Sequence, residues 1–180
     1  SLRKLQGEYP RLRIGIFPSY GTLEVVLEGE GADEGAKKLI SEFPTFHYGA
    51  PSLSEALLDA FVSRGKTLAL AESCTGGAAA AEIVRVAGAS SYFLGSIVSY
   101  SNSWKERLLA VSRTTLVKEG AVSEPAVREM AAGLFAESEA DVVAAVSGIA
   151  GPSGGSSQKP VGTVYFAIGE RGGQRSEEHT

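Results

Sequence analysis

The chain has 180 residues, of which 43% are hydrophobic and 21% are charged, and its formal net charge at pH 7 is −4. This composition is typical of a globular protein with one full domain and a smaller one, and an acidic balance does not favour nucleic acid or an anionic membrane as a partner. No apolar run approaches the roughly 20 residues that span a bilayer. Because Cys74 is the single cysteine, a disulfide framework is excluded, and we expect a cytoplasmic protein.

The two ends of the sequence are unusual. The sequence begins with Ser1 and not with methionine, so we expect a fragment of a longer protein. Residues 175–180 resemble the translation of a sequencing-adapter oligonucleotide. We therefore treat this hexapeptide as a suspected non-native tail and leave it out of the expected fold.

Residues 1–49 are expected to form a small β-β-α piece. Apolar residues alternate over residues 11–29 on both sides of a turn that contains proline and glycine, which predicts a β-hairpin. Asp33 is expected to cap a short helix over residues 34–43. Residues 45–51 then have the composition of a linker.

Residues 50–174 show strands that alternate with helices. Ser52 and Glu55 have the spacing of a capping box at the start of a helix that ends at Gly65. Strands are expected at residues 67–71, 96–100, 141–146 and 163–168, and further helices at residues 78–86, 103–110 and 125–138. This alternation predicts an α/β fold, in which a mostly parallel sheet has helices on both faces. Ligands of such sheets bind beyond the carboxyl ends of the strands.

The first candidate site is the turn over residues 72–77, whose sequence is Glu-Ser-Cys-Thr-Gly-Gly. Ser73 and Thr75 precede a helix whose first amides lack internal partners and can bind an anion or a developing oxyanion. Gly76 and Gly77 allow a ligand to approach the backbone closely. In the alternative interpretation, which spacing alone slightly favours, Ser73 or Thr75 is only the helix cap.

The second candidate site is the segment over residues 100–105. A hydroxyl nucleophile needs a group that takes its proton, and a partly buried lysine can do so because desolvation lowers its pKa. Lys105 is the candidate base, and Tyr100 can relay the proton. In the alternative interpretation, Tyr100 ends a core strand and Lys105 is solvated. Cys74 is a second candidate nucleophile, since a helix N-terminus would lower the pKa of its thiol, but most single cysteines are inert.

The third candidate site is the glycine-rich loop between residues 147 and 162. Successive amides of such a loop form a nest for phosphate, and Lys159 adds a positive charge. A loop of this length is typical of a functional segment. The two histidines, His47 and His179, lie in the linker and in the suspected tail, and no cluster has metal-ligand spacing. We therefore expect no metal.

Six strings then occur in one order, at residues 71–77, 88–95, 100–105, 120–123, 148–155 and 159–164. With them, residues 52–169 resemble the C-terminal domain of the CinA family (competence/damage-inducible protein A), the nicotinamide-nucleotide amidases. The preceding piece resembles part of the small KH-like linker domain of that family. It lacks the Gly-x-x-Gly loop of RNA-binding KH domains, so RNA binding is not inferred.

The resemblance implies hydrolysis of nicotinamide mononucleotide to nicotinic acid mononucleotide and ammonia, in pyridine nucleotide salvage and without a cofactor. Ser73 would be the nucleophile, activated by Tyr100 and Lys105. The substrate would lie against Glu72, Thr75, Gly76, Gly77, Asn102, Ser147, Gly148, Gly151, Gly154, Gly155 and Lys159. The resemblance also implies a homo-oligomer, such as a dimer, and a further C-terminal strand and helix, which we expect to be missing from this sequence.

Two other functions compete with the amidase. A non-catalytic nucleotide-binding or oligomerisation module would bind the mononucleotide without turning it over. A short-chain dehydrogenase also uses serine, tyrosine and lysine, but its tyrosine and lysine lie one helical turn apart. Tyr100 and Lys105 are five positions apart, and no glycine-rich dinucleotide turn follows the first strand. We therefore disfavour the dehydrogenase.

Overall fold

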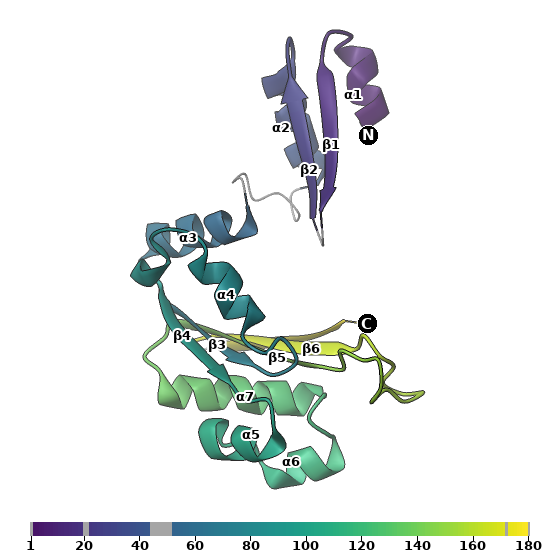
Figure 1. Ribbon diagram of the computed structural model, residues 1–180. Helices are drawn as coiled ribbons and strands as arrows, with labels where there is room; N and C mark the ends of the chain where they lie inside the picture. Colours follow the sequence, from purple (N-terminus) through teal and green to yellow (C-terminus); the bar gives the residue numbers. More distant parts are fainter. Residues whose placement is uncertain (1, 20–21, 44–51, 172, 180) are drawn as a thin grey trace. The chain divides into compact units, whose positions relative to one another are not determined.

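The computed structural model describes residues 2–19, 22–43, 52–171 and 173–179, which belong to two compact units, residues 1–49 and 50–180 (Figure 1). In these ranges no helix has both the length and the apolar character needed to cross a membrane. The first unit contains α1 (Leu2–Glu8), β1 (Arg13–Ser19), β2 (Thr22–Glu28) and α2 (Ala32–Glu42). The second unit contains the candidate site.

The first unit has the expected hairpin and an additional helix. Strands β1 and β2 pair antiparallel, and α1, which the sequence did not predict, contributes the buried Leu5 to the core of this unit. Helix α2 begins two residues earlier than expected. Its N-cap is Gly31, at φ 89°, so the prediction that Asp33 caps this helix is wrong. Asp33 lies in the first turn, where its negative charge interacts favourably with the positive end of the helix dipole. The expected linker, residues 45–51, lies outside the described residues.

The second unit contains a five-stranded sheet. Its strands are β3 (Leu68–Glu72), β4 (Phe93–Val98), β5 (Val142–Gly148), β6 (Val164–Glu170) and β7 (Gly173–His179), and their order is β4-β3-β5-β6-β7. Strand β3 pairs parallel with both β4 and β5, whereas β6 and β7 add antiparallel pairs at one side. The α/β class is confirmed. The carboxyl ends of the three parallel strands, β3, β4 and β5, lead into the three candidate sites.

The end of the chain differs from the expectation. We expected a strand after β6 to be missing and set residues 175–180 apart, but β7 covers residues 173–179 and pairs antiparallel with β6, from Gly173 opposite Glu170 to His179 opposite Val164. Such pairing uses backbone amides and carbonyls, which every non-proline residue carries. The likeness of residues 175–180 to an adapter translation was therefore a poor guide to this strand.

Helices cover both faces of the sheet, as predicted. Helices α3 (Leu53–Arg64) and α4 (Ala78–Val84) lie on one face, and α5 (Asn102–Leu109), α6 (Arg113–Lys118) and α7 (Glu124–Glu137) lie on the other (Figure 1). The cap prediction for α3 is confirmed, because the Ser52 hydroxyl accepts the Glu55 amide at 3.2 Å and donates to the Glu55 carboxylate at 2.9 Å. Gly65 ends α3 in the left-handed conformation.

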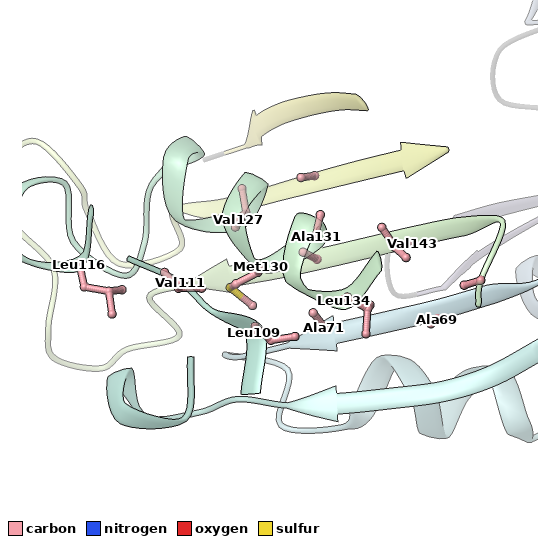
Figure 2. Packing of buried hydrophobic residues seen from close by; sticks show 13 residues of the cluster. Ala69, Ala71, Leu109, Val111, Leu116, Val127, Met130, Ala131, Leu134 and Val143 are labelled. Atoms are coloured by element: carbon pink, nitrogen blue, oxygen red, sulfur yellow. The ribbon is translucent and has the colours of Figure 1, made fainter. Parts of the chain in front are cut away.

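Alternating residues of β3 divide the core between the two faces. Leu68 and Leu70 pack in the cluster under α3 and α4, whereas Ala69 and Ala71 belong to the cluster under α7. Figure 2 shows the second cluster, in which Met130 and Leu134 of α7 lie over these small side chains. Small residues on β3 allow α7 to pack closely against the sheet. Leu109 of α5 belongs to the same cluster, so this packing also supports α5.

Helix α7 contacts the end of α5 with no side chain between them. A Cβ atom at Gly133 would lie 1.9 Å from the carbonyl oxygen of Leu109. We therefore expect Gly133→Ala to lower the free energy of unfolding by about 1–3 kcal/mol, because backbone has to move to remove the overlap. Urea denaturation checks this, with Ala132→Ser, at an exposed position of the same helix, as the control. Equal stability of the two variants would contradict this packing.

Candidate active site

Ser73 lies directly beyond the carboxyl end of β3, between β4 and β5. Its amide donates to the carbonyl of Val146 at 3.0 Å, and the amide of Ser99 donates to the carbonyl of Glu72 at 2.8 Å. Backbone hydrogen bonds from both sides therefore hold the strand end. The Ser73 side chain is buried, with the residue 7% exposed.

Lys105 brings its amine to this hydroxyl from helix α5. The helix begins after Ser101, whose hydroxyl accepts the amide of Trp104 at 3.2 Å. The Lys105 Nζ lies 2.8 Å from Ser73 Oγ, and it donates to the carbonyl of Ser99 at 2.6 Å and to that of Tyr100 at 3.4 Å. Lys105 is 1% exposed, so the alternative of a solvated lysine is wrong. The two side chains are 32 positions apart in the sequence and meet because β3 and β4 are neighbours.

Burial changes the acid–base behaviour of this amine. Desolvation lowers the pKa of Lys105 from its ordinary value, and the charge of a Cys74 thiolate would oppose that shift to a smaller extent. Carbonyl and hydroxyl oxygens are its hydrogen-bond partners, and none of them is a carboxylate. A larger fraction of the amine is therefore neutral near pH 7 than for a solvated lysine, and a neutral amine can accept a proton.

Tyr100 contributes its main-chain carbonyl to the site. The residue is 72% exposed, and within the described ranges its hydroxyl makes no hydrogen bond. Strand β4 ends at Val98, so the alternative in which Tyr100 ends a core strand is wrong. The structure thus brings Ser73 and Lys105 together and leaves the phenol of Tyr100 in solvent.

Glu72 is fully buried and binds the start of helix α4. One carboxylate oxygen accepts the amides of Gly77 (3.0 Å) and Ala79 (3.1 Å), and the other accepts the amide of Ala80 (3.0 Å) and the hydroxyl of Ser96 (2.9 Å). With 0% of its surface exposed, Glu72 has no access to a ligand. This corrects the expectation that it contacts the substrate.

The ionised form of Glu72 is favoured in this position. Burial alone would raise the pKa of its carboxyl, but the surrounding donors outweigh burial and lower the pKa. The hydroxyl of Thr75 is near this carboxylate and contributes to the lowering, although it makes no hydrogen bond of ordinary geometry. The site therefore holds a buried carboxylate whose charge is compensated by the helix.

The same hydrogen bonds correct the prediction that the first amides of the helix bind an anion. The amides of Gly77, Ala79 and Ala80 are already taken by Glu72. Two amides immediately after the serine, those of Cys74 and Thr75, donate to no carbonyl or side-chain oxygen among the described residues. These two amides lie near the Cys74 thiol, whose pKa they lower.

Cys74 does not have the properties of a reactive thiol. Burial raises the pKa of its thiol, whereas the sequence predicted that the helix N-terminus would lower it. The backbone amides of Cys74 and Thr75 and the charge of Lys105 lower this pKa, but burial outweighs them. The Coulombic effect of Glu72 also contributes to raising the pKa of this thiol.

The glycine-rich loop contacts the turn over residues 119–121 through two of the predicted residues. The buried hydroxyl of Ser147 donates to the carbonyl of Ala121 at 2.8 Å. The amine of Lys159 donates to the carbonyl of Glu119 at 2.7 Å. Both side chains therefore have a structural partner, but the Lys159 ammonium retains two further N–H donors for an anion.

The glycines predicted at the site allow close backbone contacts. A Cβ atom at Gly148 would lie 3.0 Å from Cys74 Sγ, so this residue brings the loop against the serine turn. Gly76, Gly77, Gly151 and Gly154 have positive φ angles, and a Cβ atom at Gly155 would lie 2.7 Å from the Val161 nitrogen. Asn102 is the exposed first residue of α5. In the described ranges no group of three acidic, histidine or cysteine side chains is placed to hold a metal ion.

Two residues of the site were missed by the sequence interpretation. Ser99 contributes the carbonyl closest to the Lys105 amine, and Ser96 donates to Glu72. A carbonyl oxygen is the same in every residue, so no sequence signal marks Ser99. For Ser96, the signal available was a hydroxyl within an otherwise apolar strand.

Comparisons with known proteins agree with this architecture. The family model described as the CinA C-terminal domain matches residues 50–180. A CinA-like protein of Petrotoga mobilis is 51% identical over 132 residues, which are 73% of this chain and 33% of that protein. Nicotinamide-nucleotide amidohydrolase PncC of Escherichia coli K12 is 48% identical over 122 residues, which are 68% of this chain and 74% of that protein.

Solved structures show the same likeness. The competence/damage-inducible protein CihA of Agrobacterium tumefaciens has a TM-score of 0.67 and 39% identity, over 71% of this chain and 76% of that one. The competence damage-inducible protein A (ComA) of Klebsiella pneumoniae has a TM-score of 0.68 and 39% identity, over 71% of this chain and 79% of that one. The chain spans about a third of the length of the CinA-like relatives (33%, 30% and 35%). On the family match and these relatives, the chain belongs to the CinA family and contains its C-terminal domain.

Proposed function

We propose that this chain hydrolyses the carboxamide of nicotinamide mononucleotide to nicotinic acid mononucleotide and ammonia, with Ser73 as the nucleophile and Lys105 as its base. The observation that carries the proposal is the 2.8 Å contact between a buried lysine amine and a buried serine hydroxyl. The substrate is suggested by the similarity to the Escherichia coli protein that is named a nicotinamide-nucleotide amidohydrolase.

In the proposed acylation, the neutral amine of Lys105 takes the proton of Ser73 Oγ while this oxygen attacks the carboxamide carbon. The carbonyl oxygen becomes negative, and the amides of Cys74 and Thr75 donate to it. The protonated Lys105 then gives its proton to the leaving nitrogen, and the C–N bond breaks. Ammonia leaves, and the nicotinoyl group remains on Ser73 as an ester.

In the proposed deacylation, water attacks the ester carbon and Lys105 accepts one of its protons. The C–O bond to Ser73 breaks, the serine oxygen recovers the proton from Lys105, and the carboxylic acid is released. One water is consumed, no electron is transferred and no cofactor is needed. The enzyme returns to its initial protonation state.

The other predicted residues have proposed roles around this pair. The ring of Tyr100 is exposed, and we propose that it rotates to lie over the bound substrate and relays the proton. Thr75, Gly76, Gly77 and Asn102 would line the reacting end. The loop with Ser147, Gly148, Gly151, Gly154 and Gly155 would hold the ribose phosphate, together with Lys159. Of these, Lys159 retains donors beyond its bond to Glu119.

The wider context is also proposed. Residues 1–49 would be part of a KH-like linker domain, and residues 50–174 the amidase domain. We propose a cytoplasmic homodimer that does not bind nucleic acid. Light scattering of the purified chain tests the dimer, and a filter-binding assay with RNA tests the last point.

The direct test is ammonia release from three compounds that share the carboxamide: nicotinamide mononucleotide, nicotinamide riboside and nicotinamide. We expect turnover of the mononucleotide and little turnover of the other two, because the loop would bind the phosphate. Binding of the mononucleotide without ammonia release would favour the non-catalytic module instead. Equal turnover of all three would contradict the phosphate subsite.

Replacing the neighbouring thiol distinguishes the two candidate nucleophiles. We expect Cys74→Ser to lower kcat by less than about tenfold, which corresponds to about 1.4 kcal/mol, because only packing against Gly148 changes. Steady-state ammonia release from nicotinamide mononucleotide checks this. A loss as large as that of Ser73→Ala would assign the nucleophile to the thiol.

A further inference from the structure

We infer that Glu72 is a positioning residue, whose ionised carboxylate closes the N-terminus of helix α4 and so holds the Ser73 hydroxyl in contact with Lys105. The inference builds on the proposed function, because it explains how the nucleophile of that reaction is aligned. Glu72 does not touch the reacting atoms. It acts through the turn that it closes.

The carboxylate of Glu72 is completely hydrogen-bonded. Each carboxylate oxygen accepts two hydrogen bonds, which makes four in total. Three of the donors are amides at the start of α4, and the fourth is the Ser96 hydroxyl of β4. A carboxylate has about four acceptor positions, so all of them are used. Ionised groups that accept several amides are strongly held, and the helix dipole adds to the attraction.

Ser73 lies between two points at which the backbone is held by hydrogen bonds. On the strand side, the backbone of Glu72 and Ser73 is bonded to β4 and β5, at 2.8 Å and 3.0 Å. On the helix side, the Glu72 side chain is bonded to Gly77, Ala79 and Ala80. Between these points, the turn has the bond from the Gly76 amide to the Ser73 carbonyl, at 3.1 Å. The carboxylate therefore closes the loop that contains Ser73.

The carboxylate of Glu72 is bonded to the helix start and not to the amine of Lys105. A carboxylate beside that amine would stabilise the protonated form and suppress its action as a base. The hydrogen bonds of the Lys105 amine go to Ser73, Ser99 and Tyr100. The charge of Glu72 is instead used by the helix. The site thus combines a buried anion that is bonded to the helix with a lysine amine that is bonded to uncharged oxygens.

Glutamine at position 72 tests the inference with little change in volume. A glutamine amide offers one acceptor oxygen and an NH₂ group, so two of the four donors would face another donor. We expect Glu72→Gln to lower kcat about 100-fold, the loss typical of a reacting group displaced by about 1 Å, and to leave KM unchanged. A substrate contact would instead raise KM. Glu72→Asp keeps the charge but is shorter, and it should recover only part of the loss.

A phosphonofluoridate probe reports the alignment of Ser73 without any assumption about the substrate. Its phosphorus bonds to Ser73 Oγ, the P–F bond breaks, fluoride leaves and Lys105 takes the hydroxyl proton. We expect labelling of Ser73 in Glu72→Gln to be about 100-fold slower than in the wild type. Glu82→Gln, which removes an exposed carboxylate of the same helix, is the matched control and should label at the wild-type rate.

Hydrogen exchange of the Gly77, Ala79 and Ala80 amides separates failure of this inference from failure of the proposed function. These amides should exchange faster in Glu72→Gln than in the wild type, whether or not the protein hydrolyses an amide. Unchanged exchange, or labelling of Ser73 at the wild-type rate, overturns the inference. A wild type that releases no ammonia overturns the amidase alone. If Glu72→Gln does not fold, Ser96→Ala decides, because it removes one donor and should give a smaller loss of labelling rate.

Discussion

Replacing Lys105 with methionine or arginine is expected to lower kcat for nicotinamide mononucleotide by about 10²–10⁴-fold, the usual contribution of a general base. Methionine has no proton acceptor there. Arginine remains protonated at every accessible pH, so it fails for a different reason. Ammonia release under saturating substrate measures the loss. Activity of the arginine variant near that of the wild type would show that position 105 acts only through its positive charge.

The pH dependence follows from the direction of the pKa shift. Burial lowers the pKa of Lys105, and the base is the neutral amine, so kcat/KM should rise with pH through this lowered value and reach its plateau below the ordinary lysine value of about 10.4. In the unfolded chain Lys105 retains the ordinary pKa, so at pH values between the folded and unfolded pKa the unfolded state binds more protons than the folded state. The free energy of unfolding should therefore rise over that pH range in the wild type relative to Lys105→Met.

Ser73→Ala is expected to remove turnover, with kcat lower by about 10⁴-fold or more, because no other hydroxyl is in contact with the Lys105 amine among the described residues. Affinity for the product, nicotinic acid mononucleotide, should change little, because the substitution removes only one hydroxyl group. Isothermal titration measures the affinity and ammonia release measures the rate. Turnover that survives in the alanine variant would assign the reaction to another group.

Much of the fold was predictable because local signals and packing agreed. The capping box at Ser52 and the glycine stop at Gly65 bounded α3, and the apolar strand of residues 68–72 was predicted within a residue. Helices α1 and α6 were not predicted, because each is short and has a single buried side chain, Leu5 or Leu116, and thus no apolar repeat. Strand β7 was not predicted because we set residues 175–180 apart as a suspected non-native tail.

The site was predictable as a set of residues and less so as a geometry. Ser73 and Lys105 were selected from residue chemistry and the resemblance, and the structure places them in contact. The hydrogen bonds of Glu72 could not be deduced, because three of its four partners are backbone amides whose availability depends on where the helix begins. The same holds for the exposure of Tyr100, which depends on the direction of the chain between β4 and α5.

The close approach of Gly133 to Leu109 has a consequence for how the chain could be divided. A segment over residues 68–109 would include the serine, the lysine and the carbonyls that hold the amine. It would not include α7, which packs against the end of α5 and over β3. Such an excised segment would keep the reactive atoms of Ser73 and Lys105 but would lose the packing that aligns them. The chemical groups are local in the sequence, but their rigidity comes from a more distant helix.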